Sequence, residues 1–217
     1  VVADEEAILT WIGRNLEAVH PDYPMHHSAL IEEIATSSSN FSPFYQAVDI
    51  GEERIITGQT KSFLTWESIQ KLGIEWTGKK VIEIGCNNGY FLFKAEKLGA
   101  KCTGYDINAG SIEAAEAIKR YINSDVVFLL QDVSKSFSDS CDVLLALNML
   151  HYIEDLESFV GVIAGRSQAL VLEIGKKQVE DIVPPAIEKG HSIKKILPSH
   201  RKQGVLGERV VLYLAKN

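Results

Sequence analysis

The feature that most constrains the fold is residues 81–89, a short apolar run that carries one acid and opens into a turn with two glycines four positions apart. Val81 to Ile84 is typical of a buried strand, and Gly85 allows the backbone to turn sharply beside a ligand. Helix-forming residues follow directly, at 90–98. A strand, a glycine turn and a helix start leave free backbone N–H groups above the edge of a sheet, so this segment predicts a ligand site.

The glycine spacing argues against two common nucleotide-binding motifs. Counted from Gly85, the dinucleotide fingerprint G-x-G-x-x-G would need glycine at the positions held by Asn87 and Tyr90. No Gly-Lys-Ser/Thr follows Gly85 at the distance that a P-loop requires. NAD is therefore disfavoured, and nothing in the segment could cradle a triphosphate.

What remains is the pattern E-x-G-x-x-x-G from Glu83 to Gly89, which resembles the first motif of the class I S-adenosylmethionine-dependent methyltransferases. In that family the loop wraps the methionine and ribose portions of the cofactor, and no pyrophosphate needs a third glycine. The resemblance implies S-adenosylmethionine as cofactor and S-adenosylhomocysteine as product. It makes Cys86, Asn87 and Asn88 candidate cofactor contacts. Many family members have glycine at position 87, so the loop is expected to be slightly wider here.

A second strand is expected at residues 101–106, and it ends in an acid, Asp106, followed by Ile107. An acid at this strand end, about 20 residues beyond the first motif, is expected to accept hydrogen bonds from both ribose hydroxyls. Because Asn108 lies two residues on, Asp106 could instead form only an Asx turn at the start of the next helix.

Two later apolar runs also end in polar residues. Residues 126–130 lead into Gln131 and Asp132, with Val133 beside them, where the family resemblance implies contacts with the adenine amino group. The other run, at 142–147, leads into Asn148, which the resemblance places at the methionine end of the cofactor.

The carboxyl ends of parallel strands meet at one edge of a sheet, so these polar residues are expected to form one site. Each alone could be a solvated strand end, and the two glycines could mark close packing of a helix on the sheet. Their order and spacing favour cofactor binding. The predicted cofactor-binding residues are Glu83, Gly85, Cys86, Asn87, Asn88, Gly89, Asp106, Ile107, Gln131, Asp132, Val133 and Asn148.

The alternation of strands and helices predicts an α/β fold. The resemblance implies a Rossmann-like, seven-stranded mixed sheet in the order 3-2-1-4-5-7-6, with the last strand antiparallel, helices on both faces and an N-terminal helical extension. Helices are expected at 89–98, 109–122, 154–165 and 177–189, and further strands at 169–173, 192–197 and 208–215. Pro184 and Pro185 are expected to bend or end the last helix.

Residues 1–76 are interpreted as an N-terminal helical cap and substrate-side segment, and residues 77–217 as the methyltransferase core. The cap is expected to contain an amphipathic helix at 4–19, a short helix near 28–34, a hairpin from 45–50 to 54–57 and a helix at 61–72. Its aromatic residues could wall an acceptor pocket or seal the core. The substrate-side candidates are Tyr45, Lys61 and Trp66, whereas Trp76 is expected to lie in the core.

His151 is the best candidate for a catalytic base. It follows the fourth strand of the core by a few residues, and its unperturbed pKa suits neutral pH. Methyl transfer from a sulfonium is an in-line displacement that gains from alignment, from exclusion of water and from a base near a hydroxyl or amine acceptor. The alternative is that His151 only packs beneath the following helix.

Residues 44–98 narrow the resemblance from the methyltransferase family to one of its branches. Asp49-Ile-Gly, Ile56-Thr-Gly58 and Trp66, together with the first motif, are similar to the branch that includes enzymes modifying the wobble uridine of tRNA at its 5-oxy position. Those enzymes can use a carboxylated cofactor and transfer a carboxymethyl group. Lys61 is the only nearby candidate to hold the extra carboxylate.

Charge favours a small-molecule acceptor over tRNA. Lys and Arg number 22 against 29 Asp and Glu, which gives a net charge of −7, whereas a protein that grips RNA alone usually has a basic surface. The basic spots are pairs that are most simply solvated strand or helix ends: Lys79-Lys80, Lys176-Lys177, Lys194-Lys195 and His200-Arg-Lys202. A non-catalytic regulatory subunit that binds the cofactor, and a homodimer formed through the first helix, stay open.

Other sequence features indicate a cytoplasmic protein. No apolar run approaches the length of a membrane span, and no secretory signal is expected from residues 1–20. Cys86, Cys102 and Cys141 lack C-x-x-C spacing and are expected to be reduced core residues. The six histidines do not cluster in a metal-binding pattern, so no metal is expected.

Overall fold

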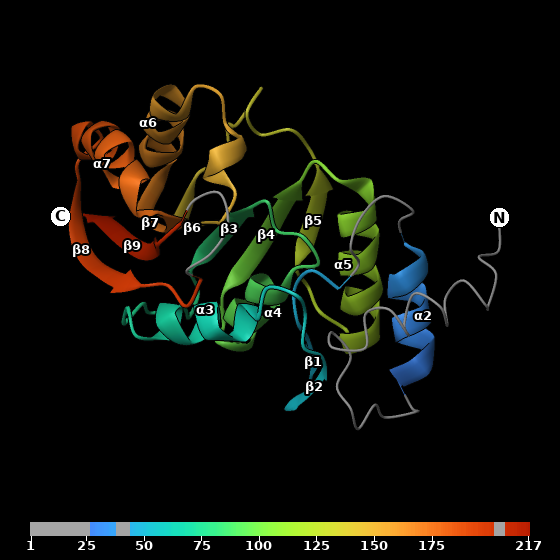
Figure 1. Cartoon of the computed structure of the whole chain (residues 1–217). Helices are drawn as coiled ribbons and strands as arrows, with labels where there is room; N and C mark the ends of the chain where they lie inside the picture. The colour runs from blue at the N-terminus through green and yellow to red at the C-terminus, as the bar shows by residue number, and fades with distance from the viewer. Residues whose placement is uncertain (1–26, 38–43, 202–206) are drawn as a thin grey trace.

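The computed structural model describes residues 27–37, 44–201 and 207–217 (Figure 1). Within them one seven-stranded sheet has the order β5-β4-β3-β6-β7-β9-β8. Counted along the chain from the first strand of this sheet, that order is 3-2-1-4-5-7-6, so the predicted topology is confirmed. The strands of this sheet are β3 (Lys80–Ile84), β4 (Lys101–Asp106), β5 (Val127–Leu130), β6 (Cys141–Leu147), β7 (Ser167–Gly175), β8 (His191–Pro198) and β9 (Arg209–Lys216).

The first five strands of the sheet are parallel, and β9 is antiparallel to both of its neighbours, β7 and β8. The carboxyl ends of β3 to β7 therefore share one edge, as predicted. The helices that follow these strands are α4 (Tyr90–Lys97), α5 (Ala109–Ile122), α6 (Leu156–Arg166) and α7 (Val179–Glu188).

Two hydrophobic clusters cover the two faces of the sheet. One contains Val81 of β3 with residues of α4 and α5, such as Phe91 and Ile118. The other contains Ile82 of β3 with residues of α6 and α7, such as Ile163. Successive residues of β3 and β6 enter opposite clusters because side chains of a strand alternate between its faces. This explains why both strands are apolar along most of their length.

The N-terminal elements pack on the first of these clusters. They are α2 (Ser28–Thr36), the antiparallel pair β1 (Val48–Ile50) and β2 (Glu53–Ile56), and α3 (Ser62–Gln70). Leu30, Ile55 and Trp66 from this segment are buried with residues of the core. The short helix, the hairpin and the helix at 61–72 were predicted, whereas the helix predicted at 4–19 lies outside the described residues.

Asp49 anchors the hairpin to α4. Its carboxylate is almost fully buried and lies 2.9 Å from Arg54 Nε and 2.6 Å from Lys94 Nζ. The Tyr90 hydroxyl donates to the same carboxylate at 3.2 Å. Burial alone would raise the pKa of Asp49, but the hydrogen bonds from Arg54 and Lys94 outweigh it and lower the pKa below its usual value.

Helix α7 does not end at Pro184 and Pro185, because both lie inside it, so of the two expected outcomes the ending is wrong. Pro185 is buried together with Ile182 and Ala186. Burial of this apolar face offsets the loss of the backbone donors that two prolines remove.

The three cysteines are free thiols and all are buried, as predicted. Burial raises the pKa of both Cys102 and Cys141 to about 12, so these thiols are un-ionised at neutral pH. None of the helices in the described ranges combines the length and the hydrophobicity needed to cross a bilayer.

Candidate functional site

The loop between β3 and α4 turns through two glycines with left-handed backbone conformations. Gly85 has φ 71° and Gly89 has φ 84°. A Cβ atom on Gly89 would lie 2.5 Å from the ring of Phe128, so glycine is needed there for space as well as for conformation. Between them Asn87 has φ 52°, a conformation that asparagine tolerates better than most residues. The loop therefore lies close against β5.

A cavity of about 510 Å³ lies at the carboxyl edge of the sheet. Its size is within the range typical of small-molecule and cofactor sites. Nine of the residues predicted from sequence line it: Tyr45, Gly85, Asn87, Asp106, Ile107, Gln131, Asp132, Val133 and Asn148. The structure thus brings the ends of β3, β4, β5 and β6 together around one space.

Asp106 joins two walls of this cavity. Its Oδ2 accepts a hydrogen bond from the backbone N–H of Asn87 at 2.9 Å, and its Oδ1 accepts one from the N–H of Asn108, also at 2.9 Å. The predicted Asx turn is therefore present, and the carboxylate lines the cavity as well. A carboxylate has about four lone-pair sites, so it can also accept a hydrogen bond from a ligand. Burial raises the pKa of Asp106, although hydrogen bonds from Asn108, Asn87 and Ile107 oppose that shift.

Asp132 lies at the far end of the edge, where β5 ends. It is partly exposed, and hydrogen bonds from Ser134 and Lys135 lower its pKa below the usual value. Its Oδ1 accepts from the Ser134 hydroxyl at 2.5 Å. The side chain therefore stays ionised as it faces the cavity.

Asn148 follows β6 in a strained left-handed conformation, with φ 58°. Its backbone N–H donates to the Glu173 carbonyl at 2.9 Å, and its side-chain Nδ2 donates to the Tyr45 hydroxyl at 3.1 Å. Asn148 Oδ1 is buried and has no hydrogen-bond partner among the described residues. Asn148 thus ties the N-terminal segment to the end of β6 and keeps one acceptor unused.

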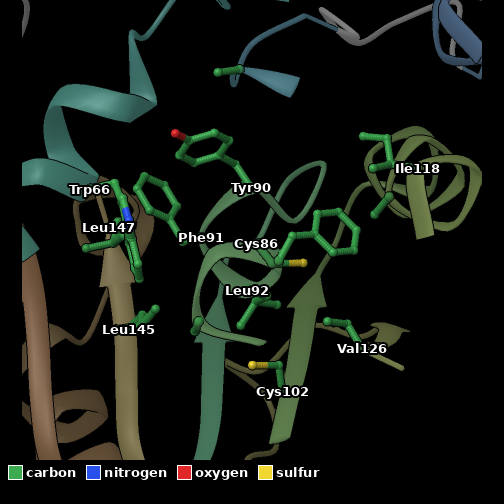
Figure 2. Packing of buried hydrophobic residues seen from close by; sticks show 14 of the residues in the cluster. Trp66, Cys86, Tyr90, Phe91, Leu92, Cys102, Ile118, Val126, Leu145 and Leu147 are labelled. Carbon is green, nitrogen blue, oxygen red and sulfur yellow. The ribbon is translucent and has the colours of Figure 1, made fainter. Parts of the chain in front are cut away.

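Three of the predicted cofactor residues lie behind the cavity wall. Glu83, Cys86 and Asn88 are fully buried and do not line the cavity. Figure 2 shows Cys86 among the packed side chains of the first cluster. Both carboxylate oxygens of Glu83 lack a partner in the described part of the chain, and burial, with a contribution from Asp106, raises the pKa of Glu83 well above its usual value.

Glu83 points away from the cavity because of its place in the strand. It alternates with Ile82 and Ile84, which face the second cluster, so its carboxylate faces the first. Asn88 instead donates from Nδ2 to the Gln46 carbonyl at 3.4 Å and lines a separate cavity of about 260 Å³ between the hairpin, α4 and α5. Gly89 does not line the larger cavity but begins α4.

Of the three substrate-side candidates, one lines the cavity and two do not. Tyr45 lines the cavity, but Trp66 is buried and packs against Trp76, with the two rings tilted and their centroids 5.6 Å apart (Figure 2 shows Trp66 within the cluster). Trp76 is itself buried, as predicted. Lys61 is exposed, precedes α3 with φ 47° and does not line the cavity. The structure therefore places Trp66 in the core and Lys61 on the surface.

His151 lies beside the cavity rather than in its lining. Its ring is 3.9 Å from that of Tyr152, which does line the cavity. Partial burial lowers the pKa of His151, and the positive charge of Arg209 lowers it further. The imidazole is therefore neutral at pH 7, but the geometry does not bring it to the cavity surface.

Sequence reasoning missed several lining residues, namely Gln46, Phe91, Met149, Tyr152, Ile153 and Arg201. Gln46 is the most informative structurally, because its Oε1 accepts from the backbone N–H of Tyr90 at 3.3 Å and so occupies an N–H that was expected to be free. Arg201 was interpreted as a solvated strand end, but its side chain is only 12% exposed. No signal in the sequence distinguishes it from the other basic residues.

Comparison with known proteins adds a family match. Residues 82–166 match the family model described as a methyltransferase domain. This region runs from β3 to α6 and includes the glycine loop, Asp106, Asp132 and Asn148.

Among solved structures, the magnesium protoporphyrin IX methyltransferase of Synechocystis PCC 6803, determined with bound S-adenosylmethionine, superposes with a TM-score of 0.59 over 72% of this chain and 77% of that one, at 18% identity. A methyltransferase from Listeria monocytogenes gives the same TM-score at 14% identity and covers 72% of this chain and 100% of that one. The sheet order and these superpositions give the chain the fold of the class I S-adenosylmethionine-dependent methyltransferases, and residues 82–166 match a methyltransferase domain.

Curated relatives give a finer likeness. A tRNA U34 carboxymethyltransferase from Campylobacter hominis is 29% identical over 106 residues, which are 48% of this chain and 37% of that protein. A ubiquinone biosynthesis O-methyltransferase from Erwinia tasmaniensis is 30% identical over 86 residues, which are 38% of this chain and 35% of that protein. The chain thus matches less than half the length of either relative.

Proposed function

We propose that this chain binds S-adenosylmethionine in the cavity at the carboxyl edge of the sheet and transfers its methyl group to a small-molecule acceptor. The observation that carries the proposal is the cavity of about 510 Å³ into which the ends of four strands converge, with Asp106 in its wall. Bound there, the cofactor supplies an electrophilic methyl group. The residues of the chain orient the two reactants and exclude water.

The roles of individual residues follow from their positions. Asp106 would accept hydrogen bonds from the ribose hydroxyls at the lone-pair sites that its backbone donors leave unused. Gln131 and Asp132, at the end of β5, would face the adenine. The glycine loop would lie along the methionine portion, because β3 is the neighbour of β4 on the side toward β6. Asn148, Tyr45 and Tyr152 would then border the acceptor.

A small acceptor is favoured over RNA by the charge of the protein. The net charge is −7, which disfavours binding to a phosphate backbone. One observation supports tRNA as a second candidate, namely the likeness to tRNA U34 carboxymethyltransferases. Since the chain spans only 37% and 42% of the length of those two proteins, regions outside the match could carry their tRNA contacts.

Calorimetry tests the donor site first. S-adenosylmethionine and S-adenosylhomocysteine are each titrated into the unmutated chain and into Asp106→Ala, and both ligands should bind the unmutated chain more tightly. Undetectable binding of both by the unmutated chain would refute the proposal.

Transfer of a labelled methyl group then identifies the acceptor class. Labelled cofactor is incubated with a fractionated metabolite extract and, separately, with total tRNA. Label in the metabolite fraction supports a small acceptor, whereas label only in tRNA supports the second candidate. Cofactor binding with no transfer to either would indicate a regulatory, non-catalytic subunit. A parallel incubation with carboxylated cofactor tests carboxymethyl transfer.

A further inference from the structure

The lining of the cavity includes a largely buried arginine side chain that the proposed donor site does not use. Arg201 lies in the connection between β8 and β9 and lines the cavity together with Tyr45, Asn148 and Tyr152. Its side chain is only 12% exposed. Burying a charged group is costly unless a partner compensates, so the position of Arg201 requires a physical reason.

Its ion-pair partner explains only part of that position. Arg201 Nε lies 3.5 Å from Glu173 Oε2, and the Glu173 side chain is completely buried. This nitrogen has no hydrogen-bond partner within the described ranges. An arginine can donate five hydrogen bonds, yet none from this side chain to another described residue is present. Most of its donor capacity is therefore unused.

Glu173 is satisfied largely by other groups. The Ser199 hydroxyl donates to its Oε1 at 2.5 Å, and the Thr65 hydroxyl lies 3.4 Å and 3.5 Å from its two oxygens. The long contact to Arg201 thus adds charge compensation and leaves the planar end of the guanidinium free to take a ligand. A carboxylate or a phosphate matches the geometry of that planar end.

The backbone also holds this segment in place. Ser199 N–H donates to the Arg209 carbonyl at 3.0 Å, Arg201 N–H donates to the Ser199 hydroxyl at 3.0 Å, and His200 Nε2 lies 3.1 Å from the Thr60 carbonyl. Arg201 is therefore preorganised rather than free to swing into solvent. Arg209 adds a second positive charge at this end, close enough to lower the pKa of His151.

The position of Arg201 in the sheet separates it from the cofactor. Glu173 pairs with Leu147 across β6 and β7, whereas the glycine loop follows β3 on the other side of β6. Neighbouring strands are about 4.8 Å apart, so the end of β7 lies roughly 10 Å from the end of β3. That places Arg201 beyond the methionine portion of a bound cofactor, on the acceptor side.

We propose that Arg201 is a specificity-determining residue that binds an anionic group, a carboxylate or a phosphate, on the acceptor. This inference rests on the proposed function of the same site. It assigns the acceptor to the class of small acidic molecules with an apolar body, because the walls beside Arg201 include Tyr45, Tyr152 and Ile153. The guanidinium orients the acceptor while the apolar walls exclude water from the reacting atoms.

The test uses three matched probes, benzoate, phenyl phosphate and the neutral benzamide, titrated by calorimetry or NMR into protein saturated with S-adenosylhomocysteine. At least one anion should bind the unmutated chain in the millimolar range and more tightly than benzamide. Arg201→Met should weaken that binding about tenfold or more and leave benzamide unchanged. Arg201→Lys should be intermediate, since it keeps the charge but loses the planar fork.

Two controls keep the outcome interpretable. Arg166→Met removes an exposed arginine at the end of α6 and should change no probe affinity. If Arg201→Met alone does not fold, the double variant with Glu173→Gln removes both charges and takes its place. Whichever of benzoate and phenyl phosphate binds the unmutated chain more tightly indicates whether the acceptor carries a carboxylate or a phosphate.

The inference fails if neither anion binds more tightly than benzamide, or if both bind Arg201→Met as well as the unmutated chain. It also fails if the binding of a carboxylated cofactor depends on Arg201 but the binding of neither free anion does. In these cases S-adenosylhomocysteine still binds, so the proposed donor site survives. Loss of S-adenosylhomocysteine binding by the unmutated chain would instead refute the proposed function itself.

Discussion

The Asp106 carboxylate accepts a hydrogen bond from the backbone N–H of Asn87 at 2.9 Å, so one side chain both shapes the glycine loop and faces the cavity. Removing it should damage the proposed donor site twice, through loss of the proposed ribose contacts and through a looser loop. We expect Asp106→Ala to weaken S-adenosylhomocysteine binding about 10-fold to 100-fold, since hydrogen bonds to charged groups contribute about 1.5–3 kcal/mol. Calorimetry checks this, with Glu180→Gln, an exposed acid on α7, as the control. An unchanged affinity would exclude Asp106 from the site.

Gly89 should not tolerate a side chain. Its φ of 84° and the 2.5 Å approach of a Cβ to the Phe128 ring predict that Gly89→Ala lowers the free energy of unfolding by at least about 2 kcal/mol. Gly165 in α6 is the matched control, because no atom lies within 4 Å of its Cβ position. Gly165→Ala should be neutral or stabilising by about 0.5–1 kcal/mol. Denaturant unfolding measures both, and equal effects would mean that neither the Phe128 ring nor the backbone conformation restricts position 89.

Glu83 should make the stability depend on pH. Burial raises its pKa well above 4.5 in the folded state, so the unfolded chain loses this proton first as the pH rises. The stability linked to this group is complete below about pH 4.5 and is lost progressively toward the raised folded-state pKa. Glu83→Gln has no carboxyl group to ionise, so it does not lose this stability as the pH rises. The free energy of unfolding of the variant, relative to that of the unmutated chain, should therefore increase from about pH 5 to about pH 8. If the difference in the free energy of unfolding between the two proteins stayed constant across that range, the raised pKa of Glu83 would be contradicted.

Asp49 should show the opposite dependence. Its pKa is lowered in the folded state by Arg54 and Lys94, so its contribution is present above about pH 3.8 and is lost as the pH falls. Asp49→Ala leaves two cations without their partner and should cost about 3 kcal/mol of unfolding free energy near pH 7. Lys94→Met leaves the Arg54 pair intact and should cost only about 1 kcal/mol. Urea denaturation of both variants checks the ranking, and a larger cost for Lys94→Met would overturn it.

The donor side of the fold could be predicted because its signals are local in sequence. Helix α5 spans Ala109–Ile122 as predicted, since Asn108 caps its start through a bond to the Ser111 N–H and Asn123 ends it in a left-handed conformation. The strand-end residues Asp106 and Asn148 were predicted for the same reason, because each directly follows an apolar run. Parallel strands then bring such ends together whatever the distant packing.

The acceptor side could not be predicted because contacts far apart in the sequence decide it. Trp66 and Tyr45 are both aromatic residues of the N-terminal segment, and composition does not reveal that one packs on Trp76 while the other reaches Asn148. Arg201 resembles any basic residue between two strands until Glu173, across the sheet, is seen to hold it. The direction in which Glu83 points depends on which face of β3 is covered by α4. A strand that is buried on both faces has no alternation of apolar and polar residues that would reveal this.

The hydrogen bonds around Glu173 have a consequence for the order in which the protein is made. Asn87 and Asp106, which shape the donor end, are 19 residues apart, whereas Thr65 and Glu173 are separated by 108 residues and Ser199 lies a further 26 beyond Glu173. During synthesis the residues of the donor end therefore emerge before the last two strands are made. The acceptor end must wait for β8 and the segment that follows it. A chain that stopped before that point would contain the residues of the proposed donor site but would lack Ser199, which donates to Glu173, and Arg201, which lines the opposite wall.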